Sequence, residues 1–205
     1  MTGAAGLDAA LAAIAAGRMV VIAGDRLRGG DIDLMIAAEA VTPEAINFMA
    51  THGRGLICLS VTPERAAQLG LTLVNPGTER QTGRPFARSI EAAHGVSTGI
   101  SAADRAHTVR VAIAPGASNT DIHSPGHVFP LIAQSGGVLT RASACEASID
   151  LARLAGAGDA AVICSIMRDD GEMARLEDIG DLIAAHGLAV AEIGELIARL
   201  ERADA

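Results

Sequence analysis

A histidine and a pair of aspartates are the first residues of this chain that could do chemistry. His127 stands between Gly126 and Val128, and its imidazole can act as an acid or base near neutral pH or simply hydrogen-bond a loop backbone. Asp31 and Asp33 are two residues apart, so in an extended loop their carboxylates would project to the same side and could bind a hard cation. Two solvated loop aspartates are the plainer interpretation, which we favour.

Cysteine and glutamate chemistry is a second possibility. The three cysteines, Cys58, Cys145 and Cys164, form no CxxC pair and are odd in number, which predicts reduced thiols rather than a disulfide framework. The Cys145 thiol could be a nucleophile, although most cysteines are inert packing residues. Glu146 opens a predicted helix, where the helix dipole stabilises a carboxylate whatever its function.

Composition and charge exclude several kinds of function. All 16 cations are arginine, and without lysine the chain cannot perform Schiff-base chemistry, attach pyridoxal phosphate or form a Walker P-loop. The formal net charge of −8 disfavours nucleic acid and anionic membranes as partners. No apolar run reaches the roughly 18 residues that span a bilayer, and the N-terminus has no basic region typical of a signal peptide. We therefore expect a cytoplasmic protein.

Apolar periodicity and turn signals predict the elements that must position these side chains. Helices are expected from 7 to 17, after Thr42-Pro43 and Thr62-Pro63, and over 146–155, 176–186 and 193–200; strands are expected over 19–23, 55–60, 109–113 and 160–166. Residues 24–33 and 114–126 are expected to be polar loops. A single α/β domain over residues 1–205, a sandwich around a mixed sheet, is the most economical architecture.

Seven segments together resemble the 3,4-dihydroxy-2-butanone 4-phosphate synthase family of riboflavin synthesis. In the family's order and spacing they are DLMIAAE (33–39), INFM (46–49), GRGLIC (53–58), TGISAADRA (98–106), PGHVFPL (125–131), GGVL (136–139) and DLARLAG (150–156). The resemblance implies an α/β fold and a homodimer. It also implies a Mg²⁺- or Mn²⁺-assisted conversion of ribulose 5-phosphate into dihydroxybutanone phosphate and formate.

The resemblance implies that much of the substrate site is retained. Arginine forks and hydroxyl groups suit phosphate on general grounds as well. By resemblance, the groups that hold substrate hydroxyls and phosphate are Arg28, Asp33, Thr108 and Arg141; His127 lies beside the reacting carbons; and Cys58, Asp104, Arg105 and Glu146 are also kept. Asp104 and Arg105 could equally form a structural ion pair at a turn.

The resemblance also implies losses. At the positions of two metal-binding residues of the family this chain has Gly29 and Ala144, and at the position of a late glutamate it has Ser165. Hydrogen and methyl groups cannot coordinate a cation, so we expect no metal site and no cofactor. The alternative is that Asp31 and Asp33 rebuild a site for Mg²⁺ or Mn²⁺.

From these features the sequence predicts a diverged, metal-independent homodimeric enzyme. It would carry out a rearrangement, dehydration or C–C lyase step on a small anionic or polyhydroxylated keto compound, in specialised metabolism. The predicted catalytic residues are His127, Asp33, Glu146 and Cys145, and the predicted substrate-binding residues are Arg28, Thr108, Arg141, Cys58, Asp104 and Arg105. Two alternatives stay open: a non-catalytic binding or scaffold subunit, and a true synthase with a rebuilt metal site.

Overall fold

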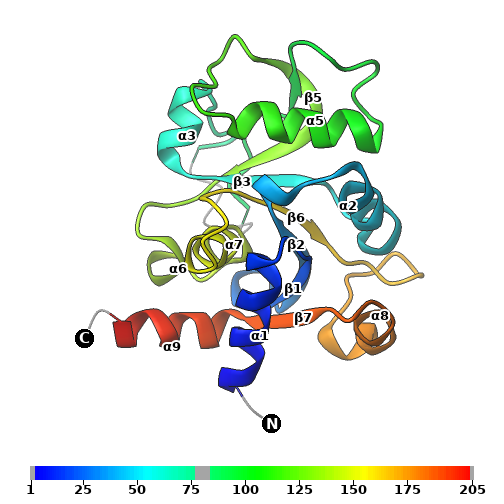
Figure 1. The fold of residues 1–205 in the computed structure, drawn as a ribbon, viewed down its shortest axis with the longest axis vertical. Helices are drawn as coiled ribbons and strands as arrows, with labels where there is room; N and C mark the ends of the chain where they lie inside the picture. The colour runs from blue at the N-terminus through cyan, green and yellow to red at the C-terminus, as the bar shows by residue number, and fades with distance from the viewer. Residues whose placement is uncertain (1–2, 77–83, 204–205) are drawn as a thin grey trace.

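A seven-stranded mixed sheet forms the centre of the protein in the computed structural model, which describes residues 3–76 and 84–203 (Figure 1). The strand order is β4-β5-β3-β6-β2-β1-β7. The strands are β1 (Val20–Asp25), β2 (Asp31–Ala37), β3 (Cys58–Val61), β4 (Ile90–Ala92), β5 (Ile122–Ile132), β6 (Ala161–Ser165) and β7 (Ala189–Glu192). Two neighbouring pairs, β1 with β7 and β3 with β5, are parallel and the others antiparallel. The predicted α/β fold with a mixed sheet is therefore confirmed.

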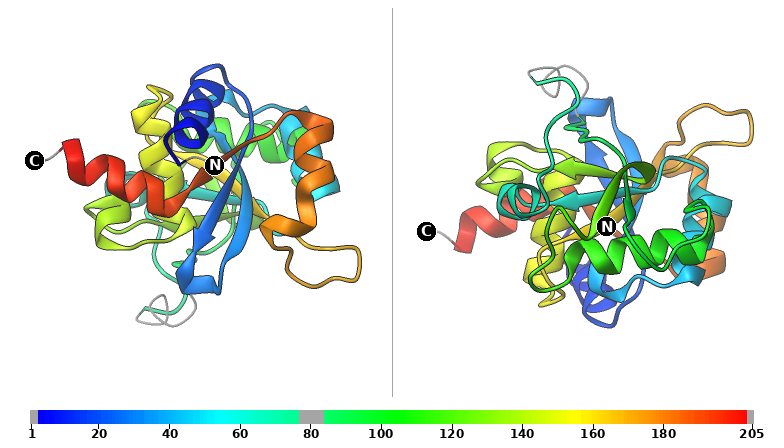
Figure 2. Two further views of the ribbon diagram at one scale, coloured as in Figure 1. Left: turned by 90° about the horizontal axis from the view of Figure 1, so that it is seen from below. Right: turned by 90° about the horizontal axis from the view of Figure 1, so that it is seen from above.

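Helices cover both faces of this sheet (Figures 1 and 2). One layer contains α1 (Gly3–Ala15), α6 (Gly137–Thr140), α7 (Ala144–Leu154) and α9 (Ile193–Ala203). The other contains α2 (Pro43–Phe48) with the π-helical turn η3 (Met49–Gly53), α3 (Pro63–Gln68), α5 (Ala102–Ile113), and α8 (Gly180–His186) with the preceding 3-10 turn η4 (Leu176–Ile179). Two further 3-10 turns, η1 (Arg26–Arg28) and η2 (Ala38–Ala40), follow β1 and β2.

The strands supply apolar side chains to both layers by alternation. In β1, Val20 and Ile22 pack in the α1/α7/α9 layer, whereas Val21 packs in the opposite layer. The two-residue period of a strand explains this division. In β2 the same alternation places Asp33 on the side of Met35, facing the α7 layer, so a carboxylate occupies a position where the pattern calls for an apolar residue.

The predicted loop over residues 24–33 is wrong at both ends. β1 continues to Asp25, and β2 already begins at Asp31, with only η1 and a glycine pair between them. The pairing of Ile22 with Asp33 draws the aspartate into the sheet. Polar composition predicted a loop, but antiparallel pairing with β1 and β6 prevails over local preference.

The predicted strand over 109–113 is also wrong, because these residues form the second half of α5. Ser101 caps that helix by accepting the Asp104 N–H at 3.0 Å, and the cap begins the helix well before the β-branched run. The predicted loop through residue 126 ends early, since β5 starts at Ile122.

Elements with local start and stop signals were predicted correctly. Thr42 and Thr62 each accept a backbone N–H three residues later, at 3.1 Å, and a proline follows each cap. Gly156 and Gly187 follow α7 and α8 with positive φ, as C-terminal glycines do. The three cysteines are free and buried. Across residues 3–76 and 84–203, no helix combines the length and apolarity that a membrane crossing needs.

Candidate functional site

The candidate site is built around the buried carboxylate of Asp33. Sheet pairing sets Asp33 in β2 directly opposite Ser165 in β6, and the Ser165 hydroxyl donates to Asp33 Oδ1 at 2.7 Å. Asp33 is 0 % exposed. A buried carboxylate stays ionised only if cations and hydrogen bonds compensate for the loss of water, and two arginines provide that compensation.

Arg28 and Arg84 reach Asp33 from opposite parts of the chain. Arg28, in η1, donates through Nη2 to Asp33 Oδ2, and Arg84 donates through Nη2 to Asp33 Oδ1 at 3.1 Å. Both guanidinium groups also donate to the Ser165 hydroxyl. Burial alone would raise the pKa of Asp33, but Arg28, Arg84 and the Ser165 hydrogen bond outweigh it and hold the pKa below its ordinary value. At neutral pH the site therefore contains a carboxylate clamped between two guanidinium groups.

Asp25 connects this group to the start of α7. Its Oδ2 accepts Arg28 Nε at 2.9 Å and the backbone N–H of Ala144 at 2.9 Å, and its Oδ1 accepts the Leu27 N–H at 3.1 Å. Burial would lower the pKa of Arg28, but its contacts with Asp33 and Asp25 raise it above the ordinary value. Arg28 is therefore a fixed, charged bridge between two buried carboxylates.

A second buried ion pair lies beside the first turn of α7. Arg141 Nη1 donates to Glu146 Oε1 at 3.1 Å, and Glu146 also accepts the Gln134 N–H at 3.0 Å and the Ser143 hydroxyl. Arg141 and Glu146 are 7 % and 0 % exposed. The predicted roles of both residues stay predictions, but in this structure they hold each other.

The two predicted site cysteines are protonated thiols. Burial raises the pKa of Cys58 to about 12, although Arg84 Nη1 lies 3.6 Å from its Sγ. Burial, together with the neighbouring Glu146 charge, also raises the pKa of Cys145 well above its ordinary value. Since the thiolate is the nucleophile, neither cysteine is activated in this state.

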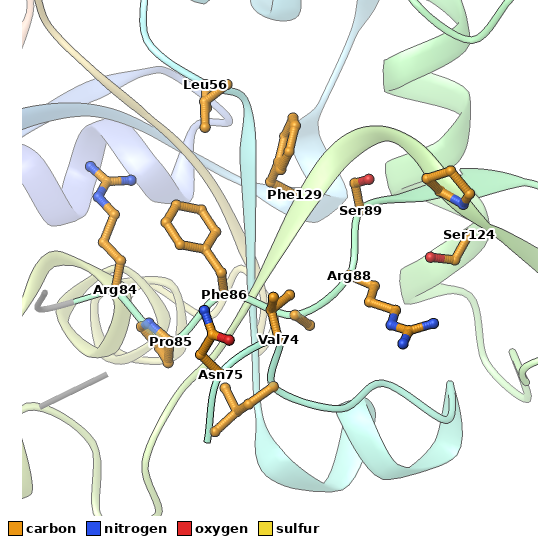
Figure 3. A pocket seen from close by; sticks show the side chains of 13 residues that line it. Leu56, Val74, Asn75, Arg84, Pro85, Phe86, Arg88, Ser89, Ser124 and Phe129 are labelled. Atoms are coloured by element: carbon orange, nitrogen blue, oxygen red, sulfur yellow. The ribbon is translucent and has the colours of Figure 1, made fainter. Parts of the chain in front are cut away.

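A cavity of about 610 Å³ opens beside Arg84. Its lining residues are Leu56, Leu73, Val74, Asn75, Arg84, Pro85, Phe86, Ala87, Arg88, Ser89, Ser124, Pro125 and Phe129. Figure 3 shows Leu56, Phe86 and Phe129 grouped together, with Arg84 and Arg88 extending away from each other on either side. The described residues that line this cavity include two arginines and no carboxylate, which favours an anionic ligand.

The histidine predicted to be the main acid or base lies on β5, outside this lining. His127 Nδ1 is 2.7 Å from Glu91 Oε1 on β4, and 41 % of its side chain is exposed. The preceding Gly126 is required by packing, since a Cβ there would lie 2.2 Å from the backbone carbon of Ile90. The close approach of β4 and β5 thus places His127 next to Glu91.

Three other predicted substrate-binding residues lie on α5, and two of them stabilise local structure around it. Thr108 Oγ1 accepts the Ala92 N–H at 3.1 Å, which ties α5 to β4. Asp104 accepts N–H groups of Ser97 and Gly99 at 3.4 and 3.0 Å instead of forming the alternative ion pair with Arg105. The third, Arg105, has a buried Nε that finds no hydrogen-bond partner among the residues that the structure describes.

Divalent cations do not fit the carboxylates of this site. Among residues 3–76 and 84–203 no three His, Cys, Asp or Glu side chains form a group that could hold a metal. Asp33 is taken by two guanidinium groups, and Asp31 pairs with Arg175 and Arg28. A divalent ion about 4 Å from one guanidinium would be repelled by about 8 kcal/mol at an effective dielectric constant of about 20. The described residues therefore do not support a rebuilt site on Asp31 and Asp33.

Sequence reasoning missed Arg84 and considered Ser165 only as a loss. Arg84 meets Asp33 across 51 positions and Ser165 across 81, and no local pattern marks such a contact. One signal was present in the sequence. Arg84 directly precedes Pro85 and Phe86, and an arginine next to apolar residues that become buried needs a partner for its charge.

Comparisons with known proteins agree on one family. The family model described as 3,4-dihydroxy-2-butanone 4-phosphate synthase matches residues 8–199. A riboflavin biosynthesis protein, RibBA, of Aquifex aeolicus is 52 % identical over 193 residues, which are 93 % of this chain and 48 % of the relative. A 3,4-dihydroxy-2-butanone 4-phosphate synthase of Neisseria meningitidis serogroup B is 50 % identical over 187 residues, which are 91 % of this chain and 52 % of that protein. The chain thus spans about half the length of these curated relatives.

A solved structure extends the similarity to the whole fold. A crystal structure of 3,4-dihydroxy-2-butanone 4-phosphate synthase in complex with two magnesium ions superposes with a TM-score of 0.90 at 37 % identity. The match covers 97 % of each chain. That relative binds magnesium, whereas Asp25, Asp31 and Asp33 of the present chain pair with arginines.

These similarities correct the main functional prediction. The sequence predicts an enzyme that has left the family's reaction for another keto compound in specialised metabolism. Relatives that are about half identical to this chain over most of its length are curated as 3,4-dihydroxy-2-butanone 4-phosphate synthases, and this contradicts the prediction. The similarities favour the alternative of a true synthase. That Gly29, Ala144 and Ser165 occupy the family's metal-binding and catalytic positions stays a prediction from the resemblance.

Proposed function

Because the chain belongs to the 3,4-dihydroxy-2-butanone 4-phosphate synthase family, we propose that it converts ribulose 5-phosphate into 3,4-dihydroxy-2-butanone 4-phosphate and formate. The four-carbon ketone phosphate and formic acid together contain all the atoms of the five-carbon sugar phosphate, so the reaction needs no oxidant or reductant. The protein must hold an anionic ketose, assist its enolisation and protect the intermediates from water.

The observation that carries this proposal is the charge around the 610 Å³ cavity. Arg84 and Arg88 line it, and Arg84 is fixed against Asp33 and Ser165. A smaller cavity of about 180 Å³ beside α7 is lined instead by Glu64, Glu146 and Asp150, with Arg153 as its cation. A sugar phosphate is a dianion near neutral pH, so the arginine-lined cavity is the electrostatically favoured site.

The reacting end of the sugar is assigned to the Arg84 end of the cavity. Arg88 is exposed at the other side of the apolar wall and suits the phosphate, because a guanidinium fork matches phosphate oxygens. No step of the reaction is assigned to a metal ion, since Asp25, Asp31 and Asp33 are already paired with arginines.

The catalytic assignments of His127, Asp33, Glu146 and Cys145 stay predictions, as do the homodimer and the cytoplasmic location. In a dimer, His127 could contact the second copy of the chain, because its side chain is exposed on β5. Light scattering of the purified chain tests that prediction, with a mass near twice 20.7 kDa as the expected result.

The proposed function is tested by incubating the purified chain with ribulose 5-phosphate and following formate with a coupled formate dehydrogenase. The assay is run with a chelator and separately with Mg²⁺ or Mn²⁺. We expect formate from the wild-type chain and none from the Asp33→Asn variant, which lacks the carboxylate that accepts from both arginines. Ribulose 5-phosphate that binds without releasing formate would contradict the proposal and indicate the binding-subunit alternative.

A further inference from the structure

We infer that the 610 Å³ cavity also binds a small aromatic anion, a ligand class different from a sugar phosphate, and that such a ligand competes with ribulose 5-phosphate. The binding of the aromatic anion depends on the cavity alone, whereas the competition rests on the proposed function. Cavities of about 300–1,000 Å³ with mainly apolar and aromatic linings typically enclose drug-sized ligands. The size and the lining of this cavity both fit that description.

Apolar side chains make up most of the described wall of the cavity. They are Leu56, Leu73, Val74, Pro85, Phe86, Ala87, Pro125 and Phe129. Leu56 and Val74 are 51 % and 52 % exposed, so covering them removes apolar surface from water, which is favourable. A sugar phosphate has a polar group on each of its carbons and cannot cover this wall without losing hydrogen bonds to water. The wall therefore favours a ligand with an apolar portion.

Two phenylalanines favour an aromatic ring as that apolar portion. Phe86 pairs with Leu131 of β5, which is two residues from Phe129, so both rings lie on the same face of the strand. Figure 3 shows them grouped with Leu56, and both are only partly buried. Aromatic rings attract one another beyond the area that they bury. A ligand ring in the cavity therefore gains contacts that a sugar does not.

The charge of the lining favours a negative group on this ligand. Arg84 and Arg88 line the cavity, and no carboxylate is among the described residues of its wall. Arg84 is held by Asp33 and Ser165. Arg88 is exposed and has no ion pair or hydrogen bond within the part of the chain that the structure describes.

Arg88 is therefore the group that we assign to the anionic substituent. A guanidinium can donate to a carboxylate, sulfonate or phosphate while its plane stacks on an aromatic ring. The proposed function places the phosphate of the substrate at the same arginine. An aromatic anion and ribulose 5-phosphate would then exclude each other from the cavity.

Fluorescence titration with anilinonaphthalene sulfonate (ANS) tests the binding, and phenylnaphthylamine, which has the same rings without the sulfonate, is the matched neutral probe. Arg88→Met removes the exposed cation, and Val74→Asp places a carboxylate in the wall. The matched controls are Arg202→Met, since Arg202 is exposed on α9, and Ile100→Asp, since Ile100 is 54 % exposed and outside the lining. Thermal unfolding shows whether each variant is folded.

We expect one ANS molecule per chain, bound about tenfold more tightly than the neutral probe, because the sulfonate gains a charge-assisted contact. Arg88→Met should remove most of that difference by weakening ANS and leaving the neutral probe unchanged. Val74→Asp should weaken ANS at least as much, and both controls should match the wild type. Ribulose 5-phosphate should displace ANS. In the formate assay, ANS should raise KM and leave kcat unchanged.

Several outcomes would overturn the inference. ANS that binds no more tightly than the neutral probe, or that binds both cavity variants as it binds the wild type, would refute the site. If Arg88→Met does not fold, Val74→Asp decides. Loss of ANS binding as light scattering shows the chain forming dimers would mean that a second copy covers the cavity instead.

The competition and the proposed function fail in different ways. Formate release in which ANS lowers kcat at an unchanged KM would refute the competition and leave the proposed function standing. Absence of formate from the wild type under every condition would refute the proposed function, and the ANS titrations, which need no turnover, would still decide whether the cavity binds an aromatic anion.

Discussion

At the scale of single residues, the site depends on a carboxylate that local patterns place wrongly. Asp33 stands in a polar stretch that predicts a loop, yet it is a buried strand residue facing Ser165. Its importance could be predicted from the resemblance, and Arg28 could be predicted with it. Arg84 could not, because its contact with Asp33 arises from the packing of distant segments. The sequence therefore predicts Asp33 and Arg28 as site residues, but not Arg84.

The charge on Asp33 should be visible in the stability of the protein. The pKa of Asp33 is lowered in the folded state, so its contribution is present above its unfolded pKa of about 3.9 and is lost as the pH falls through the lower folded value. Asp33→Asn should cost about 3–5 kcal/mol in the free energy of unfolding, because it leaves buried guanidinium groups without their anion.

Urea unfolding at several pH values between about 3 and 7 measures this effect. Below pH 4 the difference between wild type and Asp33→Asn should shrink, since the wild type is then losing the same charge. Asp8→Asn is the control, because Asp8 is 59 % exposed and should change stability by less than about 0.5 kcal/mol. A difference that is small at pH 7, or that grows on acidification, would contradict the electrostatic account.

Cys145 offers a second test at this scale. Its thiol is buried and protonated at neutral pH, so Cys145→Ala should keep formate release within a few-fold of wild type. The native thiol should react with iodoacetamide far more slowly than in urea. Loss of more than about 100-fold in kcat from a folded Cys145→Ala variant would establish the predicted nucleophile and refute this expectation.

At the scale of elements, helices with local start signals could be predicted, whereas strands that depend on long-range pairing could not. Helices α2 and α3 have a threonine cap and a proline, and their starts were predicted from these residues. The strands β2, β4, β5 and β7 were missed, because they are short or interrupted by polar residues, glycine or proline, and exist through their partners in the sheet. The site takes Asp33 from β2 and part of the cavity wall from β5, so its geometry was harder to predict than its residue types.

The β4–β5 pair gives an element-scale prediction. Gly126→Ala would place a Cβ 2.2 Å from the backbone of Ile90, so the strands must separate, at a cost of about 1–3 kcal/mol. The contact between His127 and Glu91 should weaken with it. The matched control is Gly194→Ala in α9, where a Cβ meets nothing within 4 Å and alanine should be neutral or slightly stabilising. Thermal unfolding compares the two variants, and equal midpoints would contradict the packing argument.

At the scale of the whole molecule, the sheet brings together residues that are far apart in the chain. Asp33, Arg84 and Ser165 come from β2, the segment before β4 and the end of β6. The class of fold was predictable because the apolar segments alternate with caps and glycines. The cavity was not, since it is lined by residues between 56 and 129 whose proximity depends on how the sheet closes.

Ligand binding should stabilise the entire fold if the cavity is the substrate site. At about 100 times its Kd, ribulose 5-phosphate should add about 2.7 kcal/mol to the free energy of unfolding, measured as a rise in the unfolding midpoint. Arg88→Met should weaken this stabilisation, because Arg88 is exposed in the cavity wall and suits the phosphate. An equal shift with ribulose, which lacks phosphate, would contradict an anion-binding site.

Carbon-13 NMR of uniformly labelled ribulose 5-phosphate incubated with the purified chain tests the central claim most directly. The account predicts labelled formate and a four-carbon ketone phosphate in equal amounts, with both products lost when Asp33 is changed to asparagine. Intact labelled sugar after prolonged incubation with the folded wild-type chain, with and without divalent metal, would contradict it.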